Sequence, residues 1–285
     1  LVRSNSSLVA DRSNQDDNQK YELFVVNADG SGGVLGRVKV SGALVTGGNV
    51  SLNPKENYNF TPDSANVVYM ADQEVDNKVE LYISTVAGVN TKLSGVTIPD
   101  GDIISFKLSG NKTLFLADRL INGVNELFVV DNSGTNLIKV NSDLVAGENV
   151  GYYSTDNNKI SYLMDMGSAG VYSAFMNNFD GASEVELVTI NGGLGTYDPA
   201  SAFAQQIVMQ NSKIYFRAAI NNSTYNLYYF NINSNTLEMV NETPGNLLLA
   251  NDSLGSSFLV APNGNYAVYR KLMTDGNNLY CSEID

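Results

Sequence analysis

The chain has 285 residues, of which 43% are hydrophobic and only 16% are charged, so it has enough apolar material for a core and is not a disordered polyampholyte. Its 17 basic and 30 acidic residues give a formal net charge of -13, which disfavours nucleic acid or an anionic membrane surface as a partner. The absence of histidine excludes a Ser-His-Asp or Cys-His relay and any His-ligated metal site.

The single cysteine, Cys281, permits no intramolecular disulfide, and we interpret it as a structural or incidental residue. No apolar run approaches the roughly 18 residues of a membrane span. The first residues lack the basic and apolar regions of a signal peptide. We therefore expect a chain without membrane insertion, from which any export signal has already been removed.

Short apolar runs recur along the chain with a period of about 46 to 58 residues. One kind ends in a small or apolar residue and Asp, at 8–11, 69–72, 115–118 and 162–165. The next opens with Glu-Leu-aromatic, at 22–24, 80–82 and 126–128, with looser copies at 171–175, 226–230 and 278–281. A third run follows most copies, at 92–93, 137–140, 185–188 and 237–240. A further run precedes several copies, at 58–60, 103–106, 207–209 and 258–260.

These runs predict strands rather than helices. They are short, rich in Val, Ile, Tyr, Phe and Leu, and separated by turns rich in Gly, Asn and Asp. One period holds four of them, and six copies fill the chain. The sequence therefore predicts an all-β fold, a six-bladed β-propeller of four-stranded antiparallel blades that forms a single domain over residues 1–285.

The best copy of the repeat resembles the TolB-like propeller repeat. It reads Phe60-Thr-Pro-Asp63, then an apolar strand to Asp72, then Glu80-Leu-Tyr82. The resemblance covers nearly the whole chain, and blades four and five depart most from the pattern. Because such repeats occur in periplasmic binding proteins, in gating domains of prolyl oligopeptidases and in many exported proteins, the resemblance implies an extracytoplasmic location.

The enzyme interpretations mostly fail on composition. A prolyl oligopeptidase relative would need Gly-x-Ser-x-Gly and a histidine, a sialidase-like propeller would need Asp-box turns ending in Trp, and an oligogalacturonate lyase relative would need a histidine-bearing metal site. One alternative stays open: a carbohydrate-active enzyme with two carboxylates about 5 to 10 Å apart at the central channel. We expect a non-catalytic module instead.

The clearest polar set consists of Asp11, Asp72, Asp118 and Asp165, which we expect to end the second strand of each blade and to open loops on one rim. These residues would form an acidic collar for a cation or a basic partner, or cap backbone N–H groups of the loops that they open; we favour the capping role. The oxygen-rich loops allow calcium, but none has full EF-hand spacing, so we expect no cofactor. For the Glu of the Glu-Leu-aromatic runs we expect a neighbouring Arg, Lys or backbone amide as partner.

Two stretches interrupt the repeat, at 41–57 and 190–203, and both connect an outermost strand to the next innermost one. Long loops on a rigid scaffold are where binding tends to reside, so Tyr197 and Asp198 join the rim candidates. The stretches are equally interpreted as tolerated insertions. We expect the rim to recognise a protein or an extended polymer.

The ends of the chain predict incomplete terminal blades. Aligning Asp11 on Asp118 makes the chain begin after the innermost strand of the first blade, and residues 278–281 form a third strand with little left for a fourth. We expect Leu1 to Ser4 either to pair beside Asn278 to Cys281 or to stand in for the missing inner strand.

Overall fold

The computed structural model describes residues 2–4, 7–14, 16–29, 36–51, 58–167, 171–190, 207–218, 226–241, 258–273 and 276–284. The chain divides into two compact units, Leu1–Lys139 and Val140–Asp285. Within the described ranges, no helix is long and apolar enough to cross a membrane.

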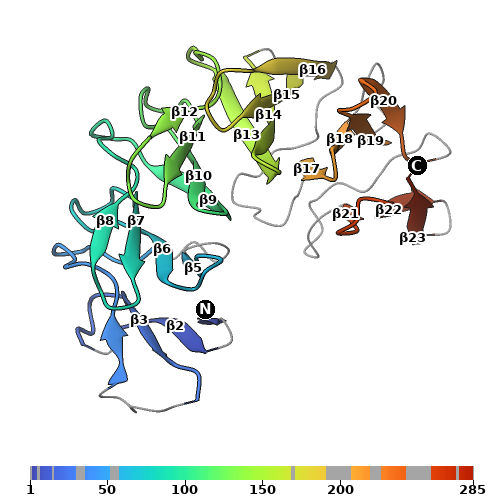
Figure 1. Cartoon of the computed structure of the whole chain (residues 1–285). Helices are drawn as coiled ribbons and strands as arrows, with labels where there is room; N and C mark the ends of the chain where they lie inside the picture. The colour runs from blue at the N-terminus through green and yellow to red at the C-terminus, as the bar shows by residue number, and fades with distance from the viewer. Residues whose placement is uncertain are drawn as a thin grey trace. The chain divides into compact units, whose positions relative to one another are not determined.

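The first unit holds three four-stranded antiparallel sheets, in which strands adjacent in the chain pair with one another (Figure 1). The first sheet consists of β1 (Val2–Ser4), β2 (Leu8–Ser13), β3 (Glu22–Asn27) and β4 (Val38–Lys39). The second consists of β5 (Tyr58–Phe60), β6 (Asn66–Ala71), β7 (Glu80–Thr85) and β8 (Asn90–Lys92). The third consists of β9 (Ile103–Ser109), β10 (Lys112–Ala117), β11 (Glu126–Asp131) and β12 (Ile138–Lys139).

The second unit has two four-stranded sheets and one of three strands. The fourth sheet consists of β13 (Glu148–Asp156), β14 (Lys159–Met166), β15 (Tyr172–Asn178) and β16 (Val185–Ile190). The fifth consists of β17 (Ile207–Gln210), β18 (Lys213–Ala218), β19 (Asn226–Asn231) and β20 (Thr236–Met239). The sixth consists of β21 (Phe258–Val260), β22 (Tyr266–Met273) and β23 (Gly276–Glu283). The predicted all-β repeat of six antiparallel sheets is confirmed.

Within each unit the core lies between successive sheets, and the alternation of leucine and aromatic residue on most of the third strands builds it. Leu81 of β7 clusters with Met70 and Leu93 of its own sheet and with Phe115 and Phe128 of the next sheet. The leucine side of one sheet therefore packs against the aromatic side of its successor, as period-two alternation requires. The second strands, such as β6 and β10, carry near-continuous apolar runs because both of their faces are buried.

Each Glu of the Glu-Leu-aromatic runs forms an ion pair with a lysine of the fourth strand, as one of the predicted partner types. Lys39 contacts Glu22 at 2.7 Å, Lys92 contacts Glu80 at 2.5 Å and Lys139 contacts Glu126 at 3.0 Å. The register explains the pairing, because each lysine lies opposite the aromatic residue two positions after the glutamate: Phe24, Tyr82 or Phe128. The glutamates themselves are buried.

The aromatic residue decides whether the second oxygen of the buried glutamate is satisfied. The hydroxyl of Tyr82 donates to Oε2 of Glu80 at 3.0 Å. Phenylalanine stands at the equivalent place beside Glu22 and Glu126, and Oε2 of each has no hydrogen-bond partner within the described part of the chain. Burial, followed by the charge of Glu80, raises the pKa of Tyr82 well above its usual value, so this hydroxyl keeps its proton and serves as a donor.

The first sheet corrects the alignment made on Asp11. Asp11 lies inside β2 and pairs with Phe24, whereas Ser13 pairs with Glu22 as Ala71 pairs with Glu80. The repeat position of Asp72 is therefore taken by Asn14, and the expected register was wrong by three residues. With the true register, β1 occupies the inner position of the first sheet, so Leu1 to Ser4 standing in for the inner strand is the alternative that holds for the described residues 2–4.

Replacing Tyr82 by Phe will lower the free energy of unfolding by about 1–2 kcal/mol, because a buried carboxylate oxygen loses its donor. The measurement is chemical denaturation of the single variant, of Glu80→Gln and of the double variant. The loss caused by Tyr82→Phe should be smaller in the Glu80→Gln background. Equal losses in both backgrounds would show that the hydroxyl does not act through Glu80.

Candidate functional site

In each antiparallel four-stranded sheet, the loop between the second and third strands and the connection to the next sheet leave from the same end. We call this the loop end, and in the first unit its described residues are 14, 16–21, 41–51, 72–79, 94–102 and 118–125. Backbone hydrogen bonds join the segments: Val45 N–H donates to Gln73 O at 3.1 Å, and Ile98 N–H donates to Arg119 O at 3.2 Å. The loop end is thus a braced surface rather than a set of independent loops.

Asp72 caps two backbone donors at this end. Its Oδ1 accepts the N–H of Asn49 at 2.5 Å, and its Oδ2 accepts the N–H of Asn77 at 3.1 Å. Asn49 belongs to the connection that enters the second sheet, and Asn77 belongs to the loop that Asp72 opens. One carboxylate therefore fixes the loop and the connection to each other.

Asp118 repeats this arrangement in the third sheet. Its Oδ1 accepts the N–H of Asp102 at 2.6 Å, and its Oδ2 accepts the N–H of Gly123 at 3.1 Å. The loop donor again lies five residues after the aspartate, as Asn77 does after Asp72. Both carboxylate oxygens are engaged in both copies, which agrees with the predicted capping role for these two residues.

Two residues that the sequence reasoning missed extend the chain of links. Oδ1 of Asn49 accepts the N–H of Tyr21 at 2.9 Å, and Oδ1 of Asp102 accepts the N–H of Val79 at 2.7 Å. Tyr21 and Val79 come just before the third strand of the preceding sheet, so each link joins one sheet to the next. The signal in the sequence is a glycine followed by Asn or Asp, at Gly48-Asn49 and Gly101-Asp102.

The glycines at these two positions are required by close approach of the backbone. A Cβ at Gly48 would lie 2.5 Å from the carbonyl oxygen of Asp72, and one at Gly101 would lie 2.7 Å from that of Asp118. Neither distance is compatible with a side chain.

The electrostatics of the links differ from those of a free acidic surface. Burial raises the pKa of Asp102. The hydrogen bond from the N–H of Val79 stabilises the charged form and lowers this pKa, whereas the nearby carboxylate of Asp118 raises it. Among the residues that the structure describes, no group of three or more Asp, Glu or Cys side chains is placed to hold a metal ion. The arrangement serves the backbone N–H groups.

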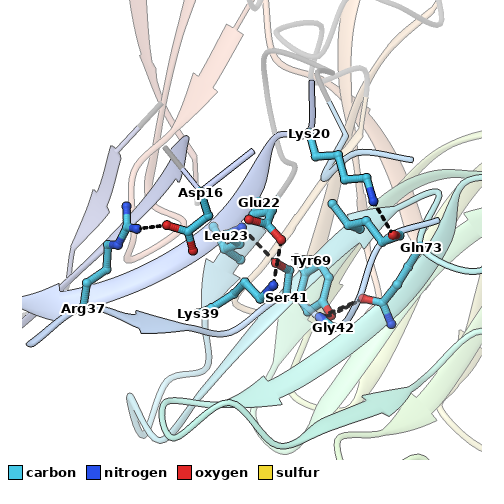
Figure 2. Close-up of polar contacts among 11 residues, drawn as sticks. Asp16, Lys20, Glu22, Leu23, Arg37, Lys39, Ser41, Gly42, Tyr69 and Gln73 are labelled. Atoms are coloured by element: carbon cyan, nitrogen blue, oxygen red, sulfur yellow. Dashed lines mark hydrogen bonds and ion pairs between the residues drawn. The ribbon is translucent and has the colours of Figure 1, made fainter. Parts of the chain in front are cut away.

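Lysines of the first two loops brace the connections as well. Lys20 Nζ donates to Leu44 O at 2.9 Å, and Lys78 Nζ donates to Thr97 O at 3.3 Å. Figure 2 shows the first of these regions, where the N–H of Gly42 also donates to Tyr69 Oη at 3.1 Å and to Gln73 Oε1 at 2.9 Å.

The remaining predicted site residues fare differently. Asp11 lies inside β2 and does not open a loop, and its carboxylate forms no hydrogen bond or ion pair with another described residue, so its place in the acidic collar was wrong. Asp165 has the register of Asp72, because it lies three residues after Tyr162, which pairs with Phe175 as Tyr69 pairs with Tyr82. However, β14 continues to Met166, so Asp165 does not end its strand. Its Oδ1 accepts the N–H of Gly167 at 3.0 Å. Tyr197 and Asp198 lie outside the described residues.

Four apolar side chains at the loop end of the second and third sheets are exposed. Val96 is 85% exposed, Val75 is 53% exposed, and Leu120 and Ile121 are 45% and 42% exposed. The connection that carries Val96 is held on one side by Lys78 and on the other by Arg119, whose Nε donates to Ser94 O at 2.9 Å. These four residues are the apolar set of the loop end.

Comparison with solved structures identifies the fold. Dipeptidyl peptidase 4 of Porphyromonas gingivalis matches at a TM-score of 0.67 with 10% identity, over 99% of this chain and 43% of that one. The β-propeller domain of the Trilobed protease from Pyrococcus furiosus matches at 0.53 with 12% identity, over 100% of this chain and 81% of that one. The chain is a β-propeller whose blades are its six sheets.

TolB from Acinetobacter baumannii is also similar, with 18% identity over 92% of this chain and 57% of that one, at a TM-score of 0.43. The propeller fold that the TolB-like resemblance of the sequence implies is confirmed by the matches to dipeptidyl peptidase 4 and to the propeller domain of the Trilobed protease. The chain spans 57% of TolB and 43% of the peptidase. No family model and no curated protein matches the sequence.

The single variants Asp72→Asn and Asp118→Asn will each have a free energy of unfolding lower by about 1–3 kcal/mol, because the amide NH₂ then faces a backbone donor. Asp11→Asn is the matched control and should leave the stability within about 0.5 kcal/mol of the parent. Denaturant unfolding of the three variants measures the difference. Equal effects at all three positions would contradict the capping role.

Millimolar calcium will leave the thermal midpoint of unfolding essentially unchanged, because both oxygens of Asp72 and of Asp118 already accept backbone N–H groups. Differential scanning calorimetry with calcium and with a chelator tests this. A rise of several degrees that disappears in the Asp72→Asn variant would show that a cation competes successfully for these carboxylates.

Proposed function

We propose that the chain is a non-catalytic binding or scaffold module, acting outside the cytoplasm, that recognises a protein partner through the loop end of its sheets. The observation that carries the proposal is the apolar set Val75, Val96, Leu120 and Ile121, whose exposed side chains lie on segments that hydrogen bonds join to one another. Exposed apolar side chains on a rigid support are the ordinary anchors of protein recognition.

The bracing supports a role in binding because it lowers the entropic cost of association. Loops that are already fixed by Asp72, Asp118 and Lys78 lose little freedom when a partner binds. The same contacts speak against catalysis by these aspartates, whose oxygens are occupied by the protein's own N–H groups. The sequence contains no histidine that would provide a general base near neutral pH.

The similarity to propeller domains of peptidases is compatible with this role but supplies no partner, because at 10% and 12% identity it concerns the fold alone. The partner class is therefore argued from the surface. Exposed Glu74 and Asp76 flank Val75 in the chain, and exposed Asp100 lies in the connection that carries Val96, which favours a protein segment that combines apolar and basic side chains.

The test is site-specific photo-crosslinking in the native host, with the photoreactive residue at Val96 or at Val89. Val89 is the matched control: it is 66% exposed and lies in the hairpin between β7 and β8, at the opposite end of the second sheet. We expect a cross-linked partner from position 96 and not from position 89. The combined change Val75→Asp and Ile121→Asp should lower the affinity for that partner at least about tenfold without changing the thermal midpoint.

Cross-links from position 89 alone, or an affinity that Val75→Asp and Ile121→Asp leave unchanged, would place binding elsewhere. The same cross-linking at Tyr197 and Asp198 tests whether the second candidate loop takes part. Fractionation of the host cell tests the proposed location.

A further inference from the structure

The loop between β10 and β11 carries an Asn-Gly pair, Asn122-Gly123, in a turn whose geometry the structure describes. The N–H of Val124 donates to Ile121 O at 3.1 Å, which closes a β-turn with the pair at its two central positions. Gly123 has a φ of 74°, a conformation that glycine adopts without strain. The pair therefore lies at the tip of a fixed turn of the loop end.

An asparagine that precedes glycine can lose its side-chain amide without an enzyme. The backbone nitrogen of the glycine attacks Cγ of the asparagine and forms a bond to it, and the Cγ–Nδ2 bond breaks. Ammonia leaves with the proton of the glycine N–H. Water then opens the cyclic imide at either of its carbonyl carbons, which gives aspartate or isoaspartate. Glycine favours the attack because it has no Cβ beside the reacting nitrogen.

Asn122 and Gly123 meet the two requirements of this reaction, a free side chain and an accessible nitrogen. The side chain of Asn122 is exposed and forms no hydrogen bond with another described residue. Gly123 is exposed as well, and a Cβ added to it would have no heavy atom within 4 Å beyond those of its chain neighbours. The N–H of Gly123 donates to Oδ2 of Asp118 at 3.1 Å, so a carboxylate lies beside the proton that must leave.

The loop between β6 and β7 contains the equivalent turn. The N–H of Lys78 donates to Val75 O at 3.1 Å, so Asp76 and Asn77 are the central residues of that turn. Asn77 has a φ of 62° and donates its N–H to the capping aspartate of its own loop, as Gly123 does. The two turns are therefore copies of one structure, with Asp-Asn in one and Asn-Gly in the other.

This copy settles two points about the Asn-Gly pair. Asp76 and Asn77 are exposed although the first and third sheets, on either side of theirs in the chain, belong to the same unit. The exposure of Asn122 is thus a property of the turn itself. Because Asp76 occupies the place of Asn122, an aspartate at this position is compatible with the fold.

We propose that Asn122 is a site of spontaneous deamidation, at which the chain converts a neutral amide to aspartate or isoaspartate. The reaction adds a negative charge next to Ile121, in the apolar set of the loop end. Its effect on recognition rests on the proposed function, whereas the conversion itself does not. The aspartate product reproduces the turn of the second sheet, and the isoaspartate product lengthens the backbone of the turn by one methylene.

A second Asn-Gly pair, Asn263-Gly264 between β21 and β22, is built against the same reaction. Oδ1 of Asn263 accepts the N–H of Asn265 at 3.0 Å, so the side chain is held. The N–H of Gly264 donates to Ala261 O at 2.8 Å. Gly264 is buried, and a Cβ added to it would lie 2.9 Å from Cβ of Asn211. The two pairs share their chemistry and differ in their surroundings.

The experiment is incubation of the purified 285-residue chain at mildly alkaline pH, followed by peptide mapping with mass spectrometry that separates aspartate from isoaspartate. We expect Asn122 to convert at least about tenfold faster than Asn263, because only in the first pair are the reacting atoms free to meet. In denaturant, where both pairs are unfolded, the two rates should agree within about a factor of three. Asn191, which also precedes glycine, lies outside the described residues, and its peptide is followed separately.

The matched variant is Gly123→Asn, because Asn77 already occupies the equivalent place with a positive φ. This change should slow the conversion of Asn122 at least about tenfold, since a Cβ then stands beside the attacking nitrogen. It should leave the thermal midpoint of unfolding unchanged, which separates the chemical effect from a change in the fold.

Two outcomes would overturn the proposal. Conversion of Asn122 in the folded chain that is no faster than conversion of Asn263 would show that the turn does not permit the attack. A rate at Asn122 that Gly123→Asn leaves unchanged would show that the glycine nitrogen is not the nucleophile. Neither readout requires a partner, so a failure of the proposed function would leave both results as they are.

Discussion

The bond between a side-chain oxygen and the backbone N–H of a connecting segment is the interaction on which the first unit depends. Where a connection from one sheet to the next is buried, each of its backbone N–H groups needs a hydrogen-bond acceptor. Asp72 and Asp118 supply acceptors to two segments at once, and Asn49 and Asp102 pass the link on to the preceding sheet. These hydrogen bonds couple the packing of the sheets to the geometry of the loops, so the segments of the loop end are held in place by the sheets.

Most of the fold was predictable because it follows from local signals that recur. Alternating apolar residues, turns rich in Gly and Asn, and the Glu-Leu-aromatic runs each identify a strand or a hairpin without knowledge of the partner strand. Repetition then multiplies a weak signal. The register of the first sheet was missed because Val9-Ala10-Asp11 looks like the end of the other second strands. Counting back from the glutamate finds the slip, since Asp72 lies eight positions before Glu80, Asp118 lies eight positions before Glu126, and Asn14 lies eight positions before Glu22.

The site was less predictable than the fold for a physical reason. The capping role of Asp72 and Asp118 is local in part, and turn chemistry indicates it. The Oδ1 atoms of the two aspartates accept the N–H groups of Asn49 and Asp102, which lie 23 and 16 residues away in the connections, where the repeat is least regular. Exposure is harder still, since Val75 and Val79 look alike in the sequence and only the folded loop separates the exposed one from the half-buried one.

The two units satisfy the same buried position with different chemistry. In the first unit a buried glutamate meets a lysine, and the cost of removing both charges from water offsets part of their attraction. In the fifth sheet Asn226 takes the place of the glutamate, and its Oδ1 accepts the Nδ2–H of Asn241 at 2.8 Å. The lysine pairs with one oxygen of each glutamate, and within the described part of the chain Oε2 of Glu22 and of Glu126 has no partner, whereas Asn226 is paired with Asn241. Leu279 shows how much the neighbouring elements contribute, because it is exposed, whereas the equivalent Leu23, Leu81 and Leu227 are buried among apolar residues of their own sheets and aromatic residues of the sheets that follow.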